Sequence, residues 1–304
     1  MQIYRTVRIL AGGSGRYLPM MAGMLSGAVD FLAPASAHPD RVRPVLLGVS
    51  GGAVAAAAAA LDMPAHRMRE IAAEFRHTQV LGRPSLRSLW TERTLYPAAR
   101  VREVAHAVVG DRTFADFVLP TESRRQPGII SSLMISVYSS RHGTLFLPQD
   151  LWRLRLHDMP VADALVAATR VPGALPAAPG LEDLFDGGLH HRVPYEVFLP
   201  EPALLLDLYS PKPYSSRGGV TLPIVHPALP MIWRRPRPFR DDTVRERTIF
   251  AGLPYGSALR PPGECPCELF DRGRALAASW LESRSRQQLL ALADSEVVRS
   301  PVSG

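Results

Sequence analysis

The chain lacks most features of a membrane, exported or disulfide-linked protein. No apolar run among its 304 residues reaches the roughly 18 needed to span a bilayer. The opening MQIYRTVRILAGG is interrupted by Arg5 and Arg8 and does not read as a signal peptide. Cys265 and Cys267 are too few for a disulfide framework, and no histidine lies near them to complete a zinc site. We therefore expect a cytoplasmic protein without metal or cofactor, with both thiols inert in a loop.

Lysine is nearly absent as well: Lys212 is the only one, and every other basic residue is arginine. We attribute this to the coding bias of a GC-rich genome. The net charge of +7 comes from arginines scattered along the chain, which argues against a nucleic-acid groove. The densest basic patch, WRRPRPFR at 233–240, is either an exposed proline-rich loop or a surface for anionic lipid head groups.

The composition favours one large globular domain. Hydrophobic residues make up 46% and charged residues 21% of the chain, enough for a sizeable core, and we find neither an internal repeat nor a clear linker. We expect a single domain over 1–295. Its motif-bearing core would span about 5–210, its loop-rich and helical part 211–295, and a flexible tail would follow at 296–304.

The hydrophobic pattern predicts alternating strands and helices. The first 62 residues read as strand, glycine-rich turn, helix, and then the same three again, which indicates a parallel sheet with helices packed on it. Further helices are expected at 64–77, 97–110, 159–170 and 270–295, and strands at 128–140, 143–150, 203–210 and 248–256. The irregular segment 81–96 is a candidate cap over a site.

A serine set in glycines lies between the second strand and its helix, in VLLGVSGGAVAAAAAAL. The G-x-S-x-G pattern in that context is typical of a nucleophile elbow, whose tight turn tolerates only small neighbours. Ser50 is the candidate nucleophile, with Gly48, Gly51 and Gly52 around it. The alternative is a turn whose serine only caps the helix.

The first strand also ends in a glycine-rich turn, AGGSGR. Its backbone N–H groups, at the start of a helix, are candidates for an oxyanion hole. The residues concerned are Gly12, Gly13, Ser14 and Gly15. Phosphate binding is the alternative, but neither G-x-x-x-x-G-K-[ST] nor G-x-G-x-x-G is present.

A candidate base comes much later, in FDGGL. Asp186 precedes Gly187 and Gly188, so its carboxylate is either presented at a strand end without bulk beside it or belongs to a simple turn. His190 and His191 follow and suggest a triad, although packed or loop histidines are the expectation here.

The order of these three motifs resembles that of the patatin-like phospholipases. The resemblance covers about 5–210 and includes ALVAATRVPGALPA ahead of the aspartate and Pro194 after the glycines. It implies a three-layer α/β/α fold with a mostly parallel central sheet. It also implies a Ser50–Asp186 dyad without histidine, and an oxyanion hole from the amides around Gly13, Ser14 and Gly15.

The chain departs from the family pattern in that glycine-rich loop. Ser14 stands where the family has a third glycine, and Tyr17 where it has its last. A serine that needed a positive φ would be strained, so the hole is expected to be reshaped.

Three functions remain open from the sequence. The first is hydrolysis of lipid or other carboxylic esters through an acyl-enzyme, and the second is acyl transfer from the same intermediate to another acceptor. The third is a binding or scaffold protein with weak activity. A lipid or small ester is the expected ligand, with peripheral membrane contact through 229–239 or 86–96, where tryptophan accompanies arginine.

Overall fold

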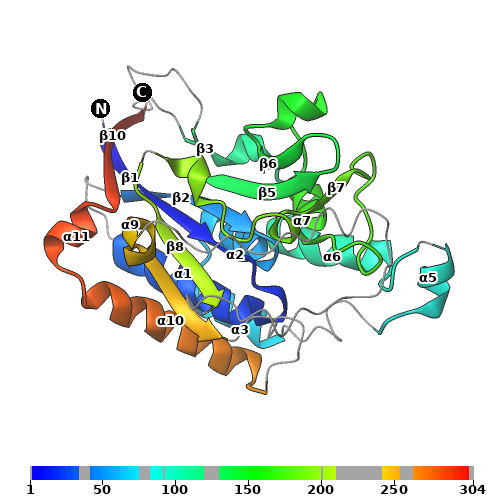
Figure 1. Cartoon of the computed structure of the whole chain (residues 1–304), viewed down its shortest axis with the longest axis horizontal. Helices are drawn as coiled ribbons and strands as arrows, with labels where there is room; N and C mark the ends of the chain where they lie inside the picture. The colour runs from blue at the N-terminus through cyan, green and yellow to red at the C-terminus, as the bar shows by residue number, and fades with distance from the viewer. Residues whose placement is uncertain are drawn as a thin grey trace.

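The computed structural model describes residues 2–33, 42–74, 83–91, 93–119, 130–199, 201–209, 242–253 and 263–300 (Figure 1). The arginine-rich patch at 233–240 and the segment 229–239 therefore lie outside the described residues.

An eight-stranded, mostly parallel sheet forms the centre of the molecule. Its main order is β6-β5-β2-β1-β8-β9, with β7 paired to β5 and β10 paired to β1. The parallel strands are β1 (Gln2–Ala11), β2 (Val42–Val49), β5 (Leu133–Ser139), β8 (Leu204–Tyr209) and β9 (Thr248–Leu253). The antiparallel additions are β6 (Gly143–Leu147), β7 (Leu184–Asp186) and β10 (Ala293–Ser300). A separate small sheet pairs β3 (Val118–Leu119) with β4 (Ile130–Ser131).

Helices cover both faces of this sheet in the predicted three-layer α/β/α arrangement. On one face pack α1 (Leu18–Leu32), α2 (Gly51–Ala60), α7 (Val161–Thr169) and α10 (Pro266–Glu282), with α3 (Ala65–Glu74) and α6 (Ala98–Val109) over them. The other face carries short elements, the 3₁₀ helix η5 (Tyr195–Phe198) and α9 (Asp242–Glu246). Further short helices are α5 (Leu86–Thr91), α11 (Arg286–Leu290), η1 (Gly15–Tyr17), η2 (Phe114–Phe117), η3 (Leu151–Leu154) and η4 (Gly187–Leu189).

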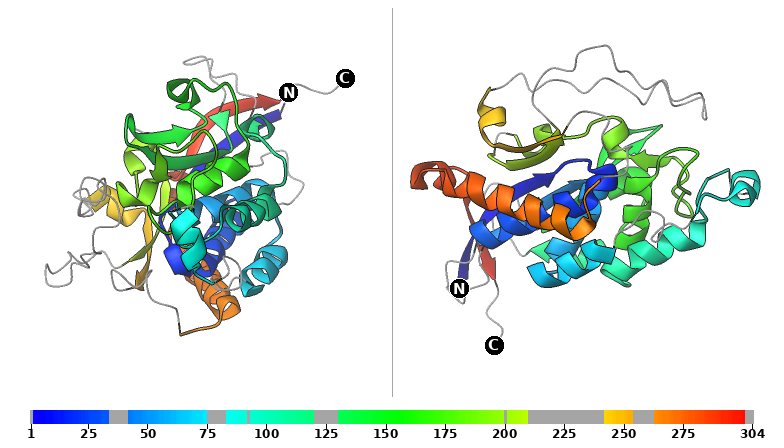
Figure 2. Two further views of the ribbon diagram at one scale, coloured as in Figure 1. Left: turned by 90° about the vertical axis from the view of Figure 1, so that its right-hand side faces the viewer. Right: turned by 90° about the horizontal axis from the view of Figure 1, so that it is seen from below.

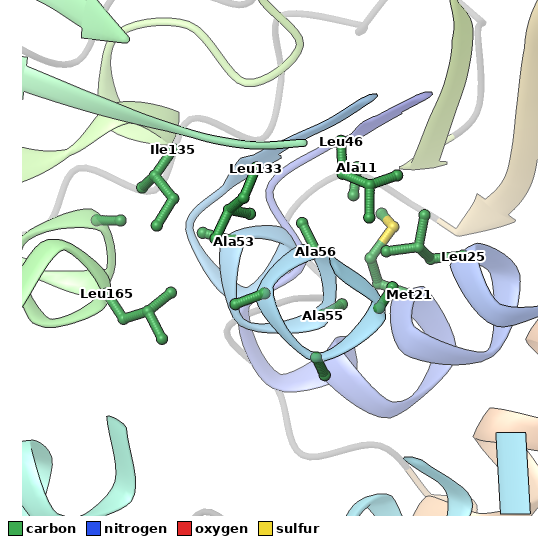
Figure 3. Close-up of a cluster of buried hydrophobic side chains, with 14 of the residues drawn as sticks. Ala11, Met21, Leu25, Leu46, Ala53, Ala55, Ala56, Leu133, Ile135 and Leu165 are labelled. Atoms are coloured by element: carbon green, nitrogen blue, oxygen red, sulfur yellow. The ribbon is translucent and has the colours of Figure 1, made fainter. Parts of the chain in front are cut away.

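Alternation along the strands divides the core between the two faces. In β2, Leu46 joins the larger cluster under the helices, whereas Leu47 and Val49 join the smaller cluster on the other face. Successive side chains of a strand point to opposite faces, so a strand buried on both sides is apolar throughout. Figure 3 shows the alanines of α2 below the strands, between Met21 and Leu25 of α1 and Leu165 of α7. Their small side chains bring α2, and with it the end of β2, close to both neighbours.

Glycines let α1 and α10 lie side by side (Figure 2). A Cβ at Gly23 would come within 2.0 Å of the Phe270 carbonyl oxygen, and one at Gly273 within 2.2 Å of the Met20 oxygen. Real Cβ atoms do not approach so closely, so a side chain at either position would push the helices apart. This packing fixes α1, whose start forms one side of the candidate site.

The C-terminal region differs from the prediction. The single helix expected at 270–295 is two helices, α10 and α11, and the tail expected from 296 is part of a strand, since β10 runs Ala293–Ser300 and pairs antiparallel with the first half of β1. The prediction that the cysteines lie in a loop is also wrong. Cys265 caps α10, Cys267 lies in its first turn, and their Sγ atoms are 2.6 Å apart.

Two further predictions need adjustment. The strand expected at 128–140 is two strands, β4 and β5, with different partners. The segment expected to cap a site contains α5, which projects from the body at the right of Figure 1. In the part of the chain that the structure describes, no helix combines the length and apolar character needed to cross a membrane.

Candidate active site

Ser50 occupies a strained turn between β2 and α2. β2 ends at Val49, α2 begins at Gly51, and Ser50 between them has φ 56° and ψ −130°. An L-residue with a side chain rarely adopts this conformation, and such strain persists mainly where function requires it. The turn is the strand-to-helix elbow that presents a nucleophile at the edge of a sheet, and the Ser50 side chain is half-buried there.

The glycines around Ser50 are required by close backbone approach. A Cβ at Gly48 would lie 2.2 Å from the Cα of Ala53, and one at Gly52 would lie 2.4 Å from the carbonyl oxygen of Ala11. Gly51 faces the glycine-rich loop, where a Cβ would meet the Ser14 Oγ at 2.2 Å. The first turn of α2 is therefore pressed against the end of β1, and the two glycine-rich turns are in contact.

Asp186 reaches Ser50 from β7, which pairs with β5 on the same edge as β2, just beyond the end of β2. It ends β7, pairs with Val137 of β5, and its Oδ2 accepts a hydrogen bond of 2.6 Å from the Ser50 Oγ. The second carboxylate oxygen, Oδ1, accepts 2.7 Å from the Gly188 N–H. Both oxygens are thus oriented, and the residues that the sequence placed 136 positions apart form one hydroxyl–carboxylate pair.

The two glycines after Asp186 make this approach possible. A Cβ at Gly187 would lie 2.6 Å from the Ser136 Oγ, and one at Gly188 would lie 3.0 Å from the Asp186 Oδ1. Side chains here would displace the carboxylate or force β7 away from β5.

Burial changes the acidity of Asp186. Its side chain is only 5% exposed, and this desolvation raises its pKa from the ordinary 3.8 to about 7, against the opposing effects of the hydrogen bonds from Ser50 and Gly188. Removing a carboxylate from water disfavours its charged form. A base with a pKa near neutrality is well matched to accepting and returning a proton at physiological pH.

The glycine-rich loop provides fewer free amides than the sequence suggested. The Gly12 N–H donates to the Leu206 carbonyl at 3.0 Å, and the Gly13 N–H to the Arg192 carbonyl at 3.3 Å. Among the described residues, the Ser14 and Gly15 amides donate no hydrogen bond. Of the four predicted positions, only these last two have N–H groups without an acceptor among the described residues.

The departure at Ser14 produces no backbone strain. Ser14 has φ −115°, and the positive φ of the loop falls on Gly15, at 50°. The condition under which Ser14 would have been strained, a positive φ, is therefore not met. The Ser14 side chain is fully buried, and its Oγ has no hydrogen-bond partner among the described residues.

The two histidines after Asp186 have contacts away from the pair. The His190 ring stacks on Tyr138, with centroids 4.9 Å apart, and its Nδ1 lies 2.8 Å from the Thr144 Oγ1. The His191 Nε2 lies 3.4 Å from a carboxylate oxygen of Glu196. These contacts agree with packed histidines rather than with a member of a triad.

A buried ion pair supports the glycine-rich loop, and sequence reasoning missed it. Arg192, whose carbonyl accepts from Gly13, donates from Nη2 to Asp207 Oδ2 at 2.8 Å and lies over the Tyr209 ring at 4.3 Å. Asp207 is 1% exposed; burial raises its pKa, while Arg192 opposes that rise. The signal was a lone aspartate in the apolar strand LLLDLY, because a buried charge requires a partner.

Comparison with known proteins agrees with the geometry. No protein of curated function matches the chain. The family model of the patatin-like phospholipases matches residues 9–199, a range that includes both glycine-rich turns, Ser50 and Asp186. This confirms the resemblance found from the motifs: the chain belongs to the patatin-like phospholipases, a family of lipid acyl hydrolases.

Proposed function

We propose that this chain hydrolyses carboxylic esters of lipids through a Ser50–Asp186 dyad. The observation that supports this most directly is the hydrogen bond of 2.6 Å between the Ser50 Oγ and the Asp186 Oδ2, at an elbow where Ser50 has φ 56°. A nucleophile within hydrogen-bond reach of an oriented base is the arrangement that covalent catalysis requires.

In the first half-reaction, the Ser50 Oγ attacks the ester carbonyl carbon while its proton passes to the Asp186 Oδ2. The carbonyl π bond opens and leaves a negative oxygen on a tetrahedral carbon. When that intermediate collapses, the bond to the alcohol oxygen breaks and Asp186 returns the proton to the departing alcohol. The acyl group is then bound to Ser50 as an ester.

In the second half-reaction, water attacks the acyl-enzyme while Asp186 accepts its proton. Collapse breaks the bond to the Ser50 Oγ, which takes the proton back, and the carboxylic acid leaves. One carboxylate serves as base and then acid in each half, a task suited to its pKa of about 7.

The negative oxygen of both intermediates requires donors. The Ser14 and Gly15 amides are the candidate donors, because their loop lies against the nucleophile elbow. A Cβ built on Gly51, the residue that follows Ser50, would be 3.6 Å from the Gly15 nitrogen. The positive end of the α2 dipole adds to their effect. One good donor of this kind contributes roughly 10²–10³ to the rate.

A fluorophosphonate probe tests whether the chain is a serine enzyme. We expect the wild type to be labelled on Ser50 and Ser50→Ala to be unlabelled, with Ser26→Ala, a buried serine of α1, labelled normally. A folded wild type that does not react would favour the scaffold alternative.

Product analysis then separates hydrolysis from acyl transfer. The wild type is incubated with phospholipid and nitrophenyl esters, with and without an acceptor alcohol, and the products are identified by mass spectrometry. Free acid as the main product in both mixtures supports hydrolysis. A new ester that accumulates at the expense of the acid identifies an acyltransferase.

We propose that α5 contacts the lipid surface from which the substrate comes. Leu86 is 77% and Trp90 89% exposed, with the exposed Arg87 beside them. The segment is tied to the loop before Asp186, since the Leu95 and Tyr96 amides donate to the carbonyls of Gly173 and Ala174. Tryptophan and arginine together suit the head-group level of a membrane.

Vesicle binding tests this contact. Leu86→Ser with Trp90→Ser should weaken binding to anionic vesicles and slow phospholipid hydrolysis while sparing a soluble nitrophenyl ester. Trp152→Ser is the control, because Trp152 is an exposed tryptophan of η3. Equal losses on soluble and vesicular substrates, or an equal effect of the control, would contradict the proposal.

A further inference from the structure

A half-buried arginine at the end of α7 contacts the strand that carries the candidate base. Arg170 follows the last residue of α7, and α7 packs against β7 (Figure 1). The Arg170 Nη1 donates to the Leu184 carbonyl at 2.9 Å and to the Glu182 carbonyl. The guanidinium also lies over the Phe185 ring, 4.4 Å from its centroid. In turn, the Arg170 carbonyl accepts the Asp186 N–H at 2.9 Å.

These contacts complete one edge of β7. The strand has only three residues and pairs along its other edge with β5. Alternate residues of a strand direct their N–H and C=O groups to the same edge, and here the Leu184 carbonyl and the Asp186 N–H both face Arg170. Such groups need partners, and Arg170 provides them as a neighbouring strand would. A very short strand would otherwise have little to fix its register.

The guanidinium is bonded to backbone carbonyls rather than to a carboxylate. Burial lowers the pKa of Arg170, and the nearby charges of Glu182 and Asp183 only oppose that effect. Their carboxylates accept from other groups, the Gly180 N–H at 2.9 Å and the Ser139 Oγ at 3.0 Å. Removing a cation from water is unfavourable. What this arginine gains in return is hold on the backbone that leads to the base.

Arg170 does not act on the base through its charge. The raised pKa of Asp186 follows from burial, against hydrogen bonds from Ser50 and Gly188, with no contribution from Arg170. The influence of Arg170 on Asp186 is therefore one of position. Catalysis needs the Asp186 Oδ2 to stay at 2.6 Å from the Ser50 Oγ, and a misplacement of about 1 Å can cost about 10²-fold in rate.

We propose that Arg170 is a positioning residue for the reaction, which holds β7 in register so that Asp186 meets Ser50. This rests on the proposed function, because its consequence is a rate of ester hydrolysis. Arg170 touches none of the reacting atoms and acts only through Asp186. Losing it should lower kcat and leave both KM and the pH dependence unchanged, since neither substrate binding nor the charge of the site is altered.

Arg170→Met tests the proposal directly. Methionine keeps an unbranched stem and removes every donor, so kcat for a soluble nitrophenyl ester should fall at least about tenfold with KM unchanged. Arg170→Lys retains a charge and donors and should recover part of the loss. An unchanged kcat in folded Arg170→Met, or a loss that appears only in KM, overturns the proposal.

Arg112→Met is the matched control. Arg112 also donates to a backbone carbonyl, that of Val109, and its own carbonyl accepts from Val161 at the start of α7. It makes the same two kinds of contact at the opposite end of the helix, so its loss should leave kcat unchanged. An equal loss in Arg112→Met would mean that α7 is merely loosened, and the proposal would be wrong.

A double substitution shows whether Arg170 acts through the base. Once Asp186→Asn has removed the base, adding Arg170→Met should lower kcat by less than about twofold, because residues that act as one unit are not additive. A tenfold further loss would overturn the proposal. The pH at which kcat/KM levels off should be the same in Arg170→Met and the wild type. A shift of about one pH unit would assign Arg170 an effect of charge instead.

Hydrogen exchange needs no turnover and separates this proposal from the hydrolase assignment. The Asp186 amide should exchange at least about tenfold faster in Arg170→Met than in the wild type or in Arg112→Met. If Arg170→Met does not fold, Arg170→Lys takes its place, with a severalfold increase expected. If the wild type hydrolyses no ester but exchange rises as stated, the role of Arg170 in holding β7 stands and the hydrolase falls. If the wild type is an esterase and neither exchange nor kcat changes, the positioning role falls and the hydrolase stands.

Discussion

The molecule contains the same unit twice, strand, glycine-rich turn and helix, with a serine in each turn. At the end of β2, Ser50 has φ 56° and a half-buried side chain that donates to Asp186. At the end of β1, Ser14 has φ −115°, and its buried hydroxyl has no partner among the described residues. The positive φ of that turn falls on Gly15 instead.

The difference shows what converts a turn serine into a nucleophile. Glycine-rich sequence alone does not, because both turns have it. The serine must itself occupy the strained position, so that its side chain is turned out of the backbone toward the edge of the sheet. Where a glycine takes the strain, the serine side chain turns inward, and the turn presents its amides instead.

The largest expected effect comes from removing the exposed hydroxyl. Ser50→Ala should lower turnover by at least about 10⁴-fold, with the fold intact, because alanine removes one atom from a turn that favours small residues. Ser14→Ala should lower it by less than about tenfold, since its backbone amide remains. Hydrolysis of a soluble nitrophenyl ester gives both values. Substantial turnover by folded Ser50→Ala, or equal losses in the two variants, would break the distinction between the turns.

Replacing the base should have the next largest effect. Asp186→Asn should reduce turnover about 10³-fold, because an amide cannot accept the proton of Ser50, and general-base catalysis contributes about 10²–10⁴. His190→Ala and His191→Ala serve as controls and should keep most of the activity. A loss of activity in one folded histidine variant would replace the dyad with a triad.

The same substitution should make the protein more stable at high pH. The Asp186 pKa is 3.8 ordinarily and about 7 in the fold, so the folded state loses stability as the pH rises from about 4 to 7. At pH 8, Asp186→Asn avoids a buried charge and keeps an oxygen for the Gly188 N–H. One pKa unit corresponds to about 1.4 kcal/mol, which limits the gain to about 4 kcal/mol. Denaturant unfolding at pH 8 and pH 4 measures it; an equal effect at both pH values would contradict a raised pKa.

The pH dependence of activity follows from the same carboxylate. Asp186 must be ionised to accept the proton of Ser50, so kcat/KM should be low in acid, rise about tenfold per pH unit, and level off above about 7. The measurement is kcat/KM for a soluble ester between pH 5 and 9. A profile that levels off near pH 4 would mean that Asp186 is solvated during catalysis.

Much of this site could be predicted from local sequence, and the predictions that failed have a common cause. The elbow at Ser50 and the aspartate before two glycines are local signals, because each depends on a turn and its immediate neighbours. Which amides of the AGGSGR loop are free is not local: Leu206 and Arg192, far along the chain, accept from Gly12 and Gly13. The strand β10 was missed for the same reason, since it exists only by pairing with β1.

The smallest effect concerns stability and tests the buried state of Ser14. A buried hydroxyl without a partner costs free energy, whereas one that is hydrogen-bonded contributes about 1 kcal/mol. The matched control is Ser131, also buried, whose Oγ donates to the Leu133 carbonyl at 2.6 Å. We expect Ser14→Ala to raise the free energy of unfolding by about 1 kcal/mol and Ser131→Ala to lower it by about the same amount, measured by denaturant unfolding at pH 7. If Ser14→Ala destabilises the protein as much as Ser131→Ala does, the Ser14 hydroxyl has a partner in solution, and the two turn serines differ less than their backbones indicate.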